Sequence, residues 1–310
     1  MIDAQTRVSD ILANPKKNQG LGPKLISDIV AKLNSDAIQN MMQGDTEQAL
    51  LLFLQALEMS GSNPELQAQC LINIGDWARR IPGNANLANE MFDLADPRVM
   101  SLITKSRALS MRAMVEVLPS ETGHPDPEGR RRGIALLQRA LEVAIQARTE
   151  DAGKAQAAES FALHRYLGQV TEALTTKKLL GLAGTLSPDE EALRAEALAI
   201  SGSLVPIDPA ERARLRYSEA LLMAPILPLE AARMLLRSAE DLRESSPLDT
   251  CRLYAQAGIL MHGRGRVNRA KELLSKAEEL EPLLHKHANS YSSLEDIRIL
   301  QNLLQQAHTS

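Results

Sequence analysis

The sequence predicts an all-α protein, and three observations carry this prediction. Aromatic residues make up only 3% of the 310 residues, with one Trp, four Tyr and three Phe. Sheets draw heavily on aromatic and β-branched residues, so a β-sandwich or barrel is disfavoured. Ala and Leu are abundant instead. From Lys24 onward, apolar residues recur at helical spacing in segments of 12 to 20 residues, and short stretches rich in Gly, Pro, Ser or Asp separate these segments.

The expected helices follow one another in a simple order. Residues 3–13 are predicted to form a short helix, and residues 14–23, with two Pro and two Gly, a linker. Ser187 supplies a capping hydroxyl, Pro188 follows in the first turn, and three acidic residues face the positive end of the helix dipole. Because the links are short, consecutive helices are expected to pack as antiparallel neighbours. Further breaks are predicted at 44–45, 60–64, 81–83, 96–97, 208–209, 246–247 and 263–265.

An internal repeat runs through these helices. A Gly is followed five residues later by Ala, then four residues later by a large apolar residue, then three residues later by Ala. Gly makes the tight turn between two helices, while the small residues allow close approach and the large one fills the space between them. The repeat occurs as Gly44, Ala49, Phe53 and Ala56, as Gly83, Ala88, Phe92 and Ala95, and as Gly265, Ala270, Leu274 and Ala277. Leu71, Gly75 and Ala78, and likewise Tyr254, Gly258 and Met261, lie on the preceding helices.

This spacing resembles the tetratricopeptide repeat, a helix-turn-helix unit in which a small residue of the first helix nests against the Ala of the second. The segment from Cys251 to Pro282 is the closest match. Corresponding positions are 38 to 59 residues apart, whereas the repeat length of the family is about 34 residues. The resemblance therefore implies a right-handed α-solenoid of irregular TPR-like repeats. A last helix near 292–307, with apolar residues on one face, is expected to cap it.

The domain organisation is predicted from the widest gap in the repeat, which lies between Ala173 and Ala232. Residues 1–23 are expected to form a short helix and linker, residues 24–185 an N-terminal TPR-like array, and residues 186–310 a C-terminal array with its capping helix. One continuous solenoid is the alternative.

Charge and motifs exclude several functions. The formal net charge of −4 disfavours nucleic-acid binding, which a basic excess would favour. No nucleophile elbow, phosphate-cradling glycine loop or HExxH motif appears, so we expect no enzyme activity, no cofactor and no metal. Cys70 and Cys251 lie in apolar helical patterns and are predicted to be buried free thiols. With no secretory signal and no membrane span visible, we expect a cytoplasmic protein.

Candidate binding residues follow from the resemblance, which implies that the first helix of each pair lines a concave groove. Such positions would contact a peptide backbone or its carboxylates, and solvated polar positions are the alternative interpretation. The predicted partner-binding residues are Gln69, Asn73, Asp76, Arg80, Arg165, Arg252 and Ile259. A second candidate is Arg130, Arg131 and Arg132, which follow a long insert at 119–129 and could bind an anion. A solvated loop is the alternative there.

The function predicted from these features is a non-enzymatic scaffold or adaptor that holds a partner protein or peptide in its groove. The alternative is a regulatory helical-repeat module that senses a signalling peptide or nucleic acid. The sequence does not decide whether the protein forms homo-oligomers through the ends of the solenoid.

Overall fold

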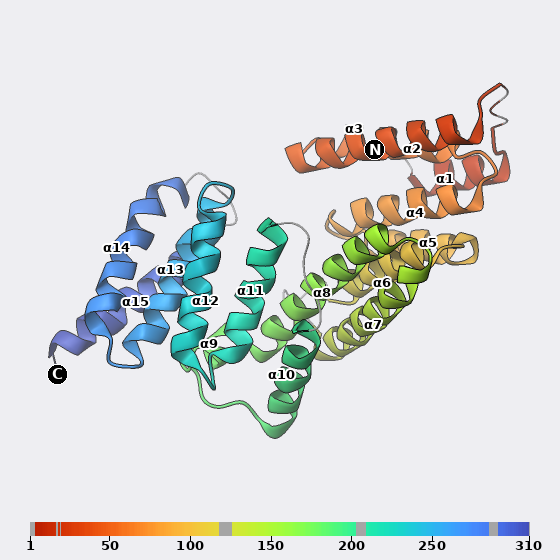
Figure 1. Ribbon diagram of the computed structural model, residues 1–310. Coiled ribbons are helices and arrows are strands. Elements are labelled where there is room, and N and C mark those ends of the chain that lie inside the picture. Colours follow the sequence, from red (N-terminus) through yellow and green to blue (C-terminus); the bar gives the residue numbers. More distant parts are fainter. Residues whose placement is uncertain are drawn as a thin grey trace. The chain divides into compact units, whose positions relative to one another are not determined.

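The computed structural model of the protein describes residues 4–16, 18, 20–117, 126–202, 209–284 and 291–309. Within these ranges the chain forms fifteen α-helices, two short 3-10 helices and no strand (Figure 1). The predicted all-α class is therefore confirmed. In chain order the elements are α1 (Ala4–Ala13), α2 (Pro23–Gln43), α3 (Thr46–Met59), α4 (Pro64–Arg79), α5 (Ala85–Ala95), η1 (Asp96–Arg98), α6 (Leu102–Glu116), α7 (Pro127–Gln146), η2 (Ala147–Thr149), α8 (Ala152–Leu174), α9 (Thr176–Leu179), α10 (Pro188–Ser201), α11 (Pro209–Met223), α12 (Pro228–Leu242), α13 (Pro247–His262), α14 (Val267–Leu284) and α15 (Tyr291–Thr309).

The helices end where the breaks in the sequence predict. Gly44 closes α2 with φ of 89°, a left-handed conformation that side chains disfavour, which explains why a glycine stands there. Asp45 then caps α3 by accepting a hydrogen bond from the Gln48 N–H at 3.0 Å. At α10 the Ser187 side chain accepts from the Glu190 N–H while the Glu190 carboxylate accepts from the Ser187 N–H, which forms a complete capping box.

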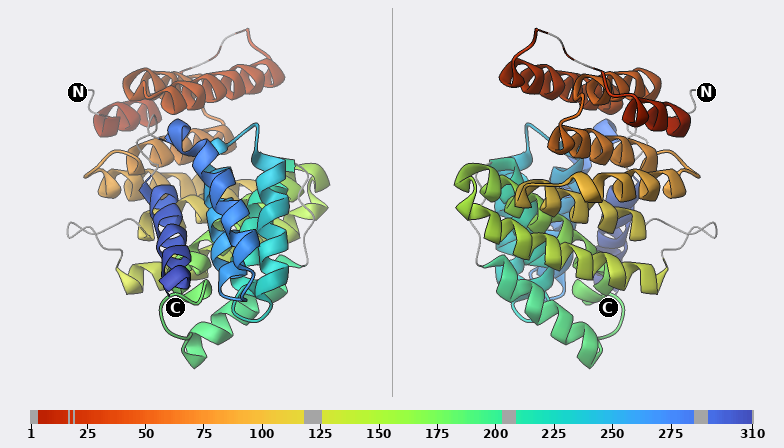
Figure 2. Two further views of the ribbon diagram at one scale, coloured as in Figure 1. Left: turned by 90° about the vertical axis from the view of Figure 1, so that its left-hand side faces the viewer. Right: turned by 90° about the vertical axis from the view of Figure 1, so that its right-hand side faces the viewer.

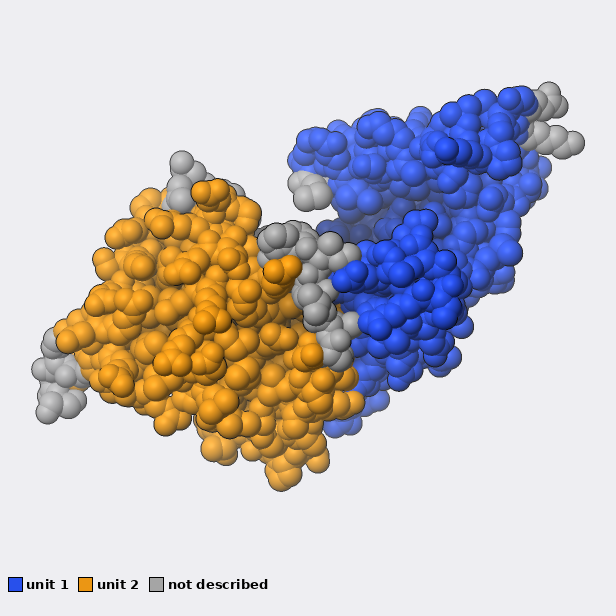
Figure 3. All heavy atoms as spheres, in the orientation of Figure 1, with its two compact units in different colours: residues 1–162 blue, residues 163–310 orange. Residues whose placement is uncertain are grey.

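The chain divides into two compact units, residues 1–162 and residues 163–310, and the division falls within α8 (Figure 3). The boundary predicted between residues 185 and 186 stays a prediction.

In the N-terminal unit, consecutive helices pack in pairs: α2 with α3, α4 with α5, and α6 with α7. α4 also contacts α2, α3 and α6, so it lies at the centre of this unit (Figure 2). The small residue predicted on the first helix of a pair is Gly75, and a Cβ built there would lie 2.6 Å from Cε1 of Phe92. Phe92 is fully buried. The glycine therefore lets α4 and α5 approach closely.

The C-terminal unit repeats this arrangement. α11, α12, α13 and α14 each pack on the next helix along the chain, and they lie side by side in Figures 1 and 2. α15 packs against α13 and α14, and Ile297, Leu300 and Leu304 are buried on its apolar face. A Cβ at Gly258 would lie 2.5 Å from Cδ2 of Leu300, so this small residue accommodates the last helix.

Both cysteines are free and buried, as predicted. Burial raises the pKa of each thiol to about 12, so neither is an activated nucleophile at neutral pH. The Cys251 thiol donates to the backbone carbonyl of Ala277 at 3.3 Å.

Candidate functional site

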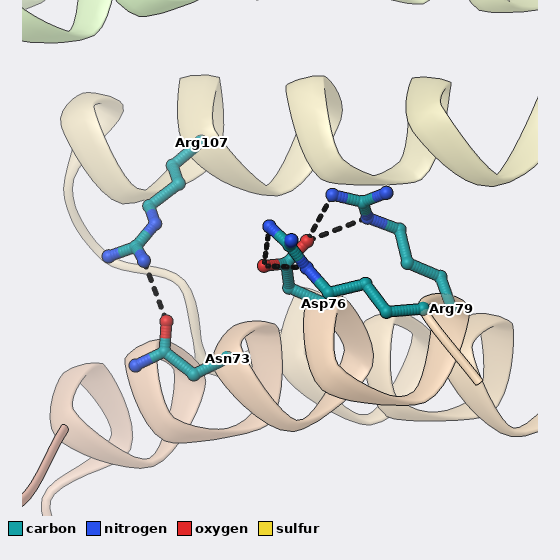
Figure 4. Close-up of polar contacts among 5 residues, drawn as sticks. Asn73, Asp76, Arg79 and Arg107 are labelled. Atoms are coloured by element: carbon teal, nitrogen blue, oxygen red, sulfur yellow. Dashed lines mark hydrogen bonds and ion pairs between the residues drawn. The ribbon is translucent and has the colours of Figure 1, made fainter. Parts of the chain in front are cut away.

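Three polar side chains connect the first helices of successive pairs in the N-terminal unit. The Asn73 amide on α4 donates a hydrogen bond to Oδ1 of Asn34 on α2 at 2.8 Å. Arg107 on α6 donates from Nη2 to Oδ1 of Asn73 at 2.6 Å (Figure 4). Asn34 and Asn73 are 9% and 4% exposed. The three residues therefore form a buried polar chain across α2, α4 and α6.

A charged cluster lies one turn further along α4. Asp76 is buried and accepts hydrogen bonds from Nε of Arg79 at 2.6 Å and from Nη2 of Arg80 at 3.2 Å (Figure 4). The two arginines follow Asp76 by three and four residues, which places them on the same helix face. With Arg107, the group holds three guanidinium groups and one carboxylate, so it carries a net charge of about +2.

Of the three arginines in this cluster, Arg107 is the one whose hydrogen bond goes to a neutral amide and not to a carboxylate. Burial lowers the pKa of its guanidinium, and the charge of Asp76 opposes this effect. Arginine stays protonated in proteins and offers five N–H donors. Among the described residues, Asn73 is its only hydrogen-bond partner. Donors of Arg107 are therefore left for another acceptor.

Arg107 also lines a pocket between α6 and α8 with a volume of about 380 Å³. The lining residues of α6 are four apart and those of α8 are three or four apart, so each set lies on one helix face. Most of the lining is apolar, and no carboxylate contributes to it in the described part of the chain. The residues that form it are Ile103, Arg107 and Met111 of α6 and Lys154, Ala157, Ala158 and Phe161 of α8.

The pocket combines apolar walls with positive charge. Its apolar walls suit a large apolar side chain, while Arg107 and Lys154 provide positive charge at the same place. Lys154 is exposed, and its Nζ lies 3.4 Å from Oδ2 of the partly exposed Asp151, a contact that solvent screens. The described residues contain no cluster of three His, Cys, Asp or Glu side chains that would hold a metal ion.

The residues predicted to bind a partner do not lie at one common site. Gln69 is half-buried and its amide donates to Glu65 at 3.4 Å. Asn73, Asp76 and Arg80 belong to the network around α4. Ile259 is 2% exposed and lies beside a different pocket, of about 510 Å³, in the C-terminal unit. Their binding role stays a prediction.

Two further predicted residues, Arg165 and Arg252, also lie in the C-terminal unit. Arg165 lies next to His164 on α8, and its charge acts on that imidazole. Arg252 lines a third pocket, which contains His164 as well.

The arginines at the start of α7 already have acidic neighbours. Arg131 Nη1 lies 3.6 Å from Oε2 of Glu128, and Arg132 Nε lies 2.8 Å from Oε2 of Glu116. Hydrogen bonding to Glu116 raises the pKa of Arg132. Arg130 is half-buried. Residues 118–125, which include most of the insert, lie outside the described part of the chain, and anion binding by these arginines stays a prediction.

Sequence reasoning missed Arg107 and Lys154, together with the apolar residues around them. The available signal was the spacing of Ile103, Arg107 and Met111, which puts one cation between two apolar residues on a single face. This pattern is common on helices that pack ordinarily, and only the position of α8 turns it into a pocket.

Comparisons with known proteins add no assignment. A scan against models of protein families finds none that matches this chain, and a search of curated proteins finds no match either. The class that the fold defines is an all-helical protein whose consecutive helices pack in pairs. None of the described helices is long and apolar enough to cross a membrane.

Proposed function

We propose that this protein is a non-enzymatic scaffold that binds a segment of a partner protein, and that its helices form a TPR-like right-handed α-solenoid. Pairwise packing of consecutive helices supports the repeat architecture, as do the close contacts of Gly75 with Phe92 and of Gly258 with Leu300. Arrays of this kind present extended surfaces and bind chains without chemical change. The protein binds and positions its partner in this proposal, and it performs no reaction.

The observation that carries the proposal is the pocket between α6 and α8. It combines apolar walls from Ile103, Met111 and Phe161 with two cations, and none of the described carboxylates lines it. Charge complementarity selects a partner segment in which a large apolar side chain stands next to a carboxylate. The apolar side chain fills the pocket, and the carboxylate accepts hydrogen bonds from the Arg107 guanidinium.

The experiment compares two double variants that change the charge of the protein equally. Lys154→Glu with Ala157→Glu places two acidic groups at the pocket, at exposed positions of α8. Arg139→Glu with Ala135→Glu makes the same change in charge at exposed positions of α7 that do not line the pocket. The partner is captured from native extract by the wild-type protein, and its affinity for all three proteins is then measured by calorimetry. We expect the pocket variant to bind about tenfold more weakly or worse, a loss of about 1.4 kcal/mol.

The α7 variant is expected to bind as the wild-type protein does, because its overall charge changes equally while the pocket is intact. Circular dichroism checks that both variants are folded. Equal affinity of the two variants would contradict the proposal, as would a wild-type protein that retains no partner.

A further inference from the structure

A separate pocket lies wholly within the C-terminal unit and has a volume of about 220 Å³. It is smaller than the usual site for a drug-sized ligand, which occupies roughly 300 Å³ or more. Unlike the pocket of the N-terminal unit, it is lined mainly by ionisable groups. These are His164 from α8, Arg214 and Tyr217 from α11, and Asp249 and Arg252 from α13.

Arg252 is held in position by two neighbours, Tyr217 and Asp296. Its guanidinium lies over the ring of Tyr217, 5.6 Å from the centroid. Its Nε lies 3.4 Å from Oδ2 of Asp296, which also accepts a hydrogen bond from the Gln256 amide at 2.8 Å. Asp296 is largely buried. Arg252 is thus oriented before any ligand binds, which reduces the entropy that binding costs.

Arg214 contributes a positive charge without a partner of its own. It is exposed, and no carboxylate in the described part of the chain lies within ion-pairing distance of it. The one carboxylate lining the pocket is Asp249, which accepts a hydrogen bond from the Ser246 hydroxyl at 2.7 Å. Of the two arginines at its walls, Arg252 is already paired with Asp296, so Arg214 is the one whose positive charge is left for a ligand.

His164 adds a polar atom that lacks a partner. Its Nδ1 is buried and makes no hydrogen bond with the described residues. A buried polar atom left in this state is destabilising, and a suitable ligand atom would relieve it. Burial, together with the charges of Arg165 and Arg214, lowers the pKa of His164 to about 4 against the opposing charge of Asp249. The imidazole is therefore neutral at pH 7 and offers one donor and one acceptor.

We propose that this pocket binds a compact oxyanion, the carboxylate or phosphate group of a small molecule, through Arg214, Arg252 and His164. The two guanidinium groups match the charge and the planar arrangement of oxygen atoms, and the imidazole donates a hydrogen bond. The volume limits the ligand to a small molecule. This inference does not depend on the binding of a partner protein at the N-terminal unit.

Calorimetry with two probes, inorganic phosphate and acetate, tests the proposal at neutral pH and constant ionic strength. We expect saturable millimolar binding of at least one probe. Phosphate alone would identify a phosphoryl ligand, and acetate alone a carboxylate. Arg214→Gln, which removes an exposed charge, is expected to weaken binding about tenfold. Arg237→Gln, an equally exposed arginine of α12 outside the pocket, is the matched control and should leave affinity unchanged.

A second measurement follows the imidazole itself. The NMR signal of His164 is assigned among the six histidines by its loss in His164→Gln. Because a bound anion favours the imidazolium, the pKa of His164 should rise by about one or more when the binding probe is present. The proposal is overturned if neither probe binds, if Arg214→Gln binds as tightly as Arg237→Gln, or if the pKa of His164 stays unchanged.

Discussion

Replacing Gly75 by Ala should destabilise the N-terminal unit by about 2 kcal/mol. Alanine ordinarily strengthens a helix relative to glycine by about 1 kcal/mol. Here, however, its Cβ would lie 2.6 Å from Cε1 and 2.8 Å from Cζ of the fully buried Phe92 ring. Overpacking of this kind costs about 1–3 kcal/mol, because the ring has no room to move. The cost exceeds the gain in helix propensity.

The measurement is chemical unfolding followed by the fluorescence of Trp77, the only tryptophan of the chain. Trp77 lies in the same unit, is 7% exposed and donates from Nε1 to the carbonyl of Thr46 at 2.9 Å. Gly153→Ala is the matched control, since a Cβ there meets nothing closer than 3.6 Å. We expect the control to match or exceed wild-type stability. Equal midpoints for Gly75→Ala and Gly153→Ala would show that α4 and α5 do not pack as described.

Replacing Asn73 by Ala should cost a similar amount, about 3 kcal/mol, for a different reason. The substitution removes both hydrogen bonds at the centre of the polar chain, so Oδ1 of Asn34 loses its donor and Arg107 loses its acceptor. A buried polar group left without a partner costs about 1–3 kcal/mol, and more when it is charged. Urea unfolding monitored through Trp77 measures the loss.

Gln69→Ala is the control on the same helix. Gln69 is half-buried and its one hydrogen bond, to Glu65, is long at 3.4 Å. Its removal should change the free energy of unfolding by less than about 0.5 kcal/mol. If Asn73→Ala were as mild as Gln69→Ala, the chain from Asn34 to Arg107 would contribute no stability.

The helices and their close contacts were predictable because the signals are local. Gly44, Asp45 and Ser187 mark helix ends through backbone conformation and capping, which depend on a few neighbouring residues. The repeat spacing also pointed to Gly75 and Phe92, and to Gly258, as packing positions. Contacts between adjacent helices of a pair follow from that spacing alone.

The candidate site was less predictable because it depends on helices further along the chain. From the sequence, Asn73 and Asp76 appear as polar positions facing a groove. The structure buries both, since Arg107, 34 residues after Asn73, supplies a hydrogen bond that no local pattern reveals. The pocket beside Arg107 is formed only when residues of α8 pack near α6, and no local pattern reveals that contact either. Likewise, the pairing of Arg252 with Asp296 joins residues 44 positions apart.

The central claim is that a partner binds at the pocket between α6 and α8, and site-specific photo-crosslinking tests it most directly. A photoreactive amino acid is placed at Ala157, an exposed residue that lines the pocket, or at Ala135, an exposed residue of α7 that does not. Irradiation in native extract is followed by mass spectrometry. We predict that Ala157 gives a crosslink to one partner segment that pairs a large apolar residue with an acidic one, and that Ala135 gives none to it. A partner that crosslinks equally from both positions, or only from Ala135, would contradict the account.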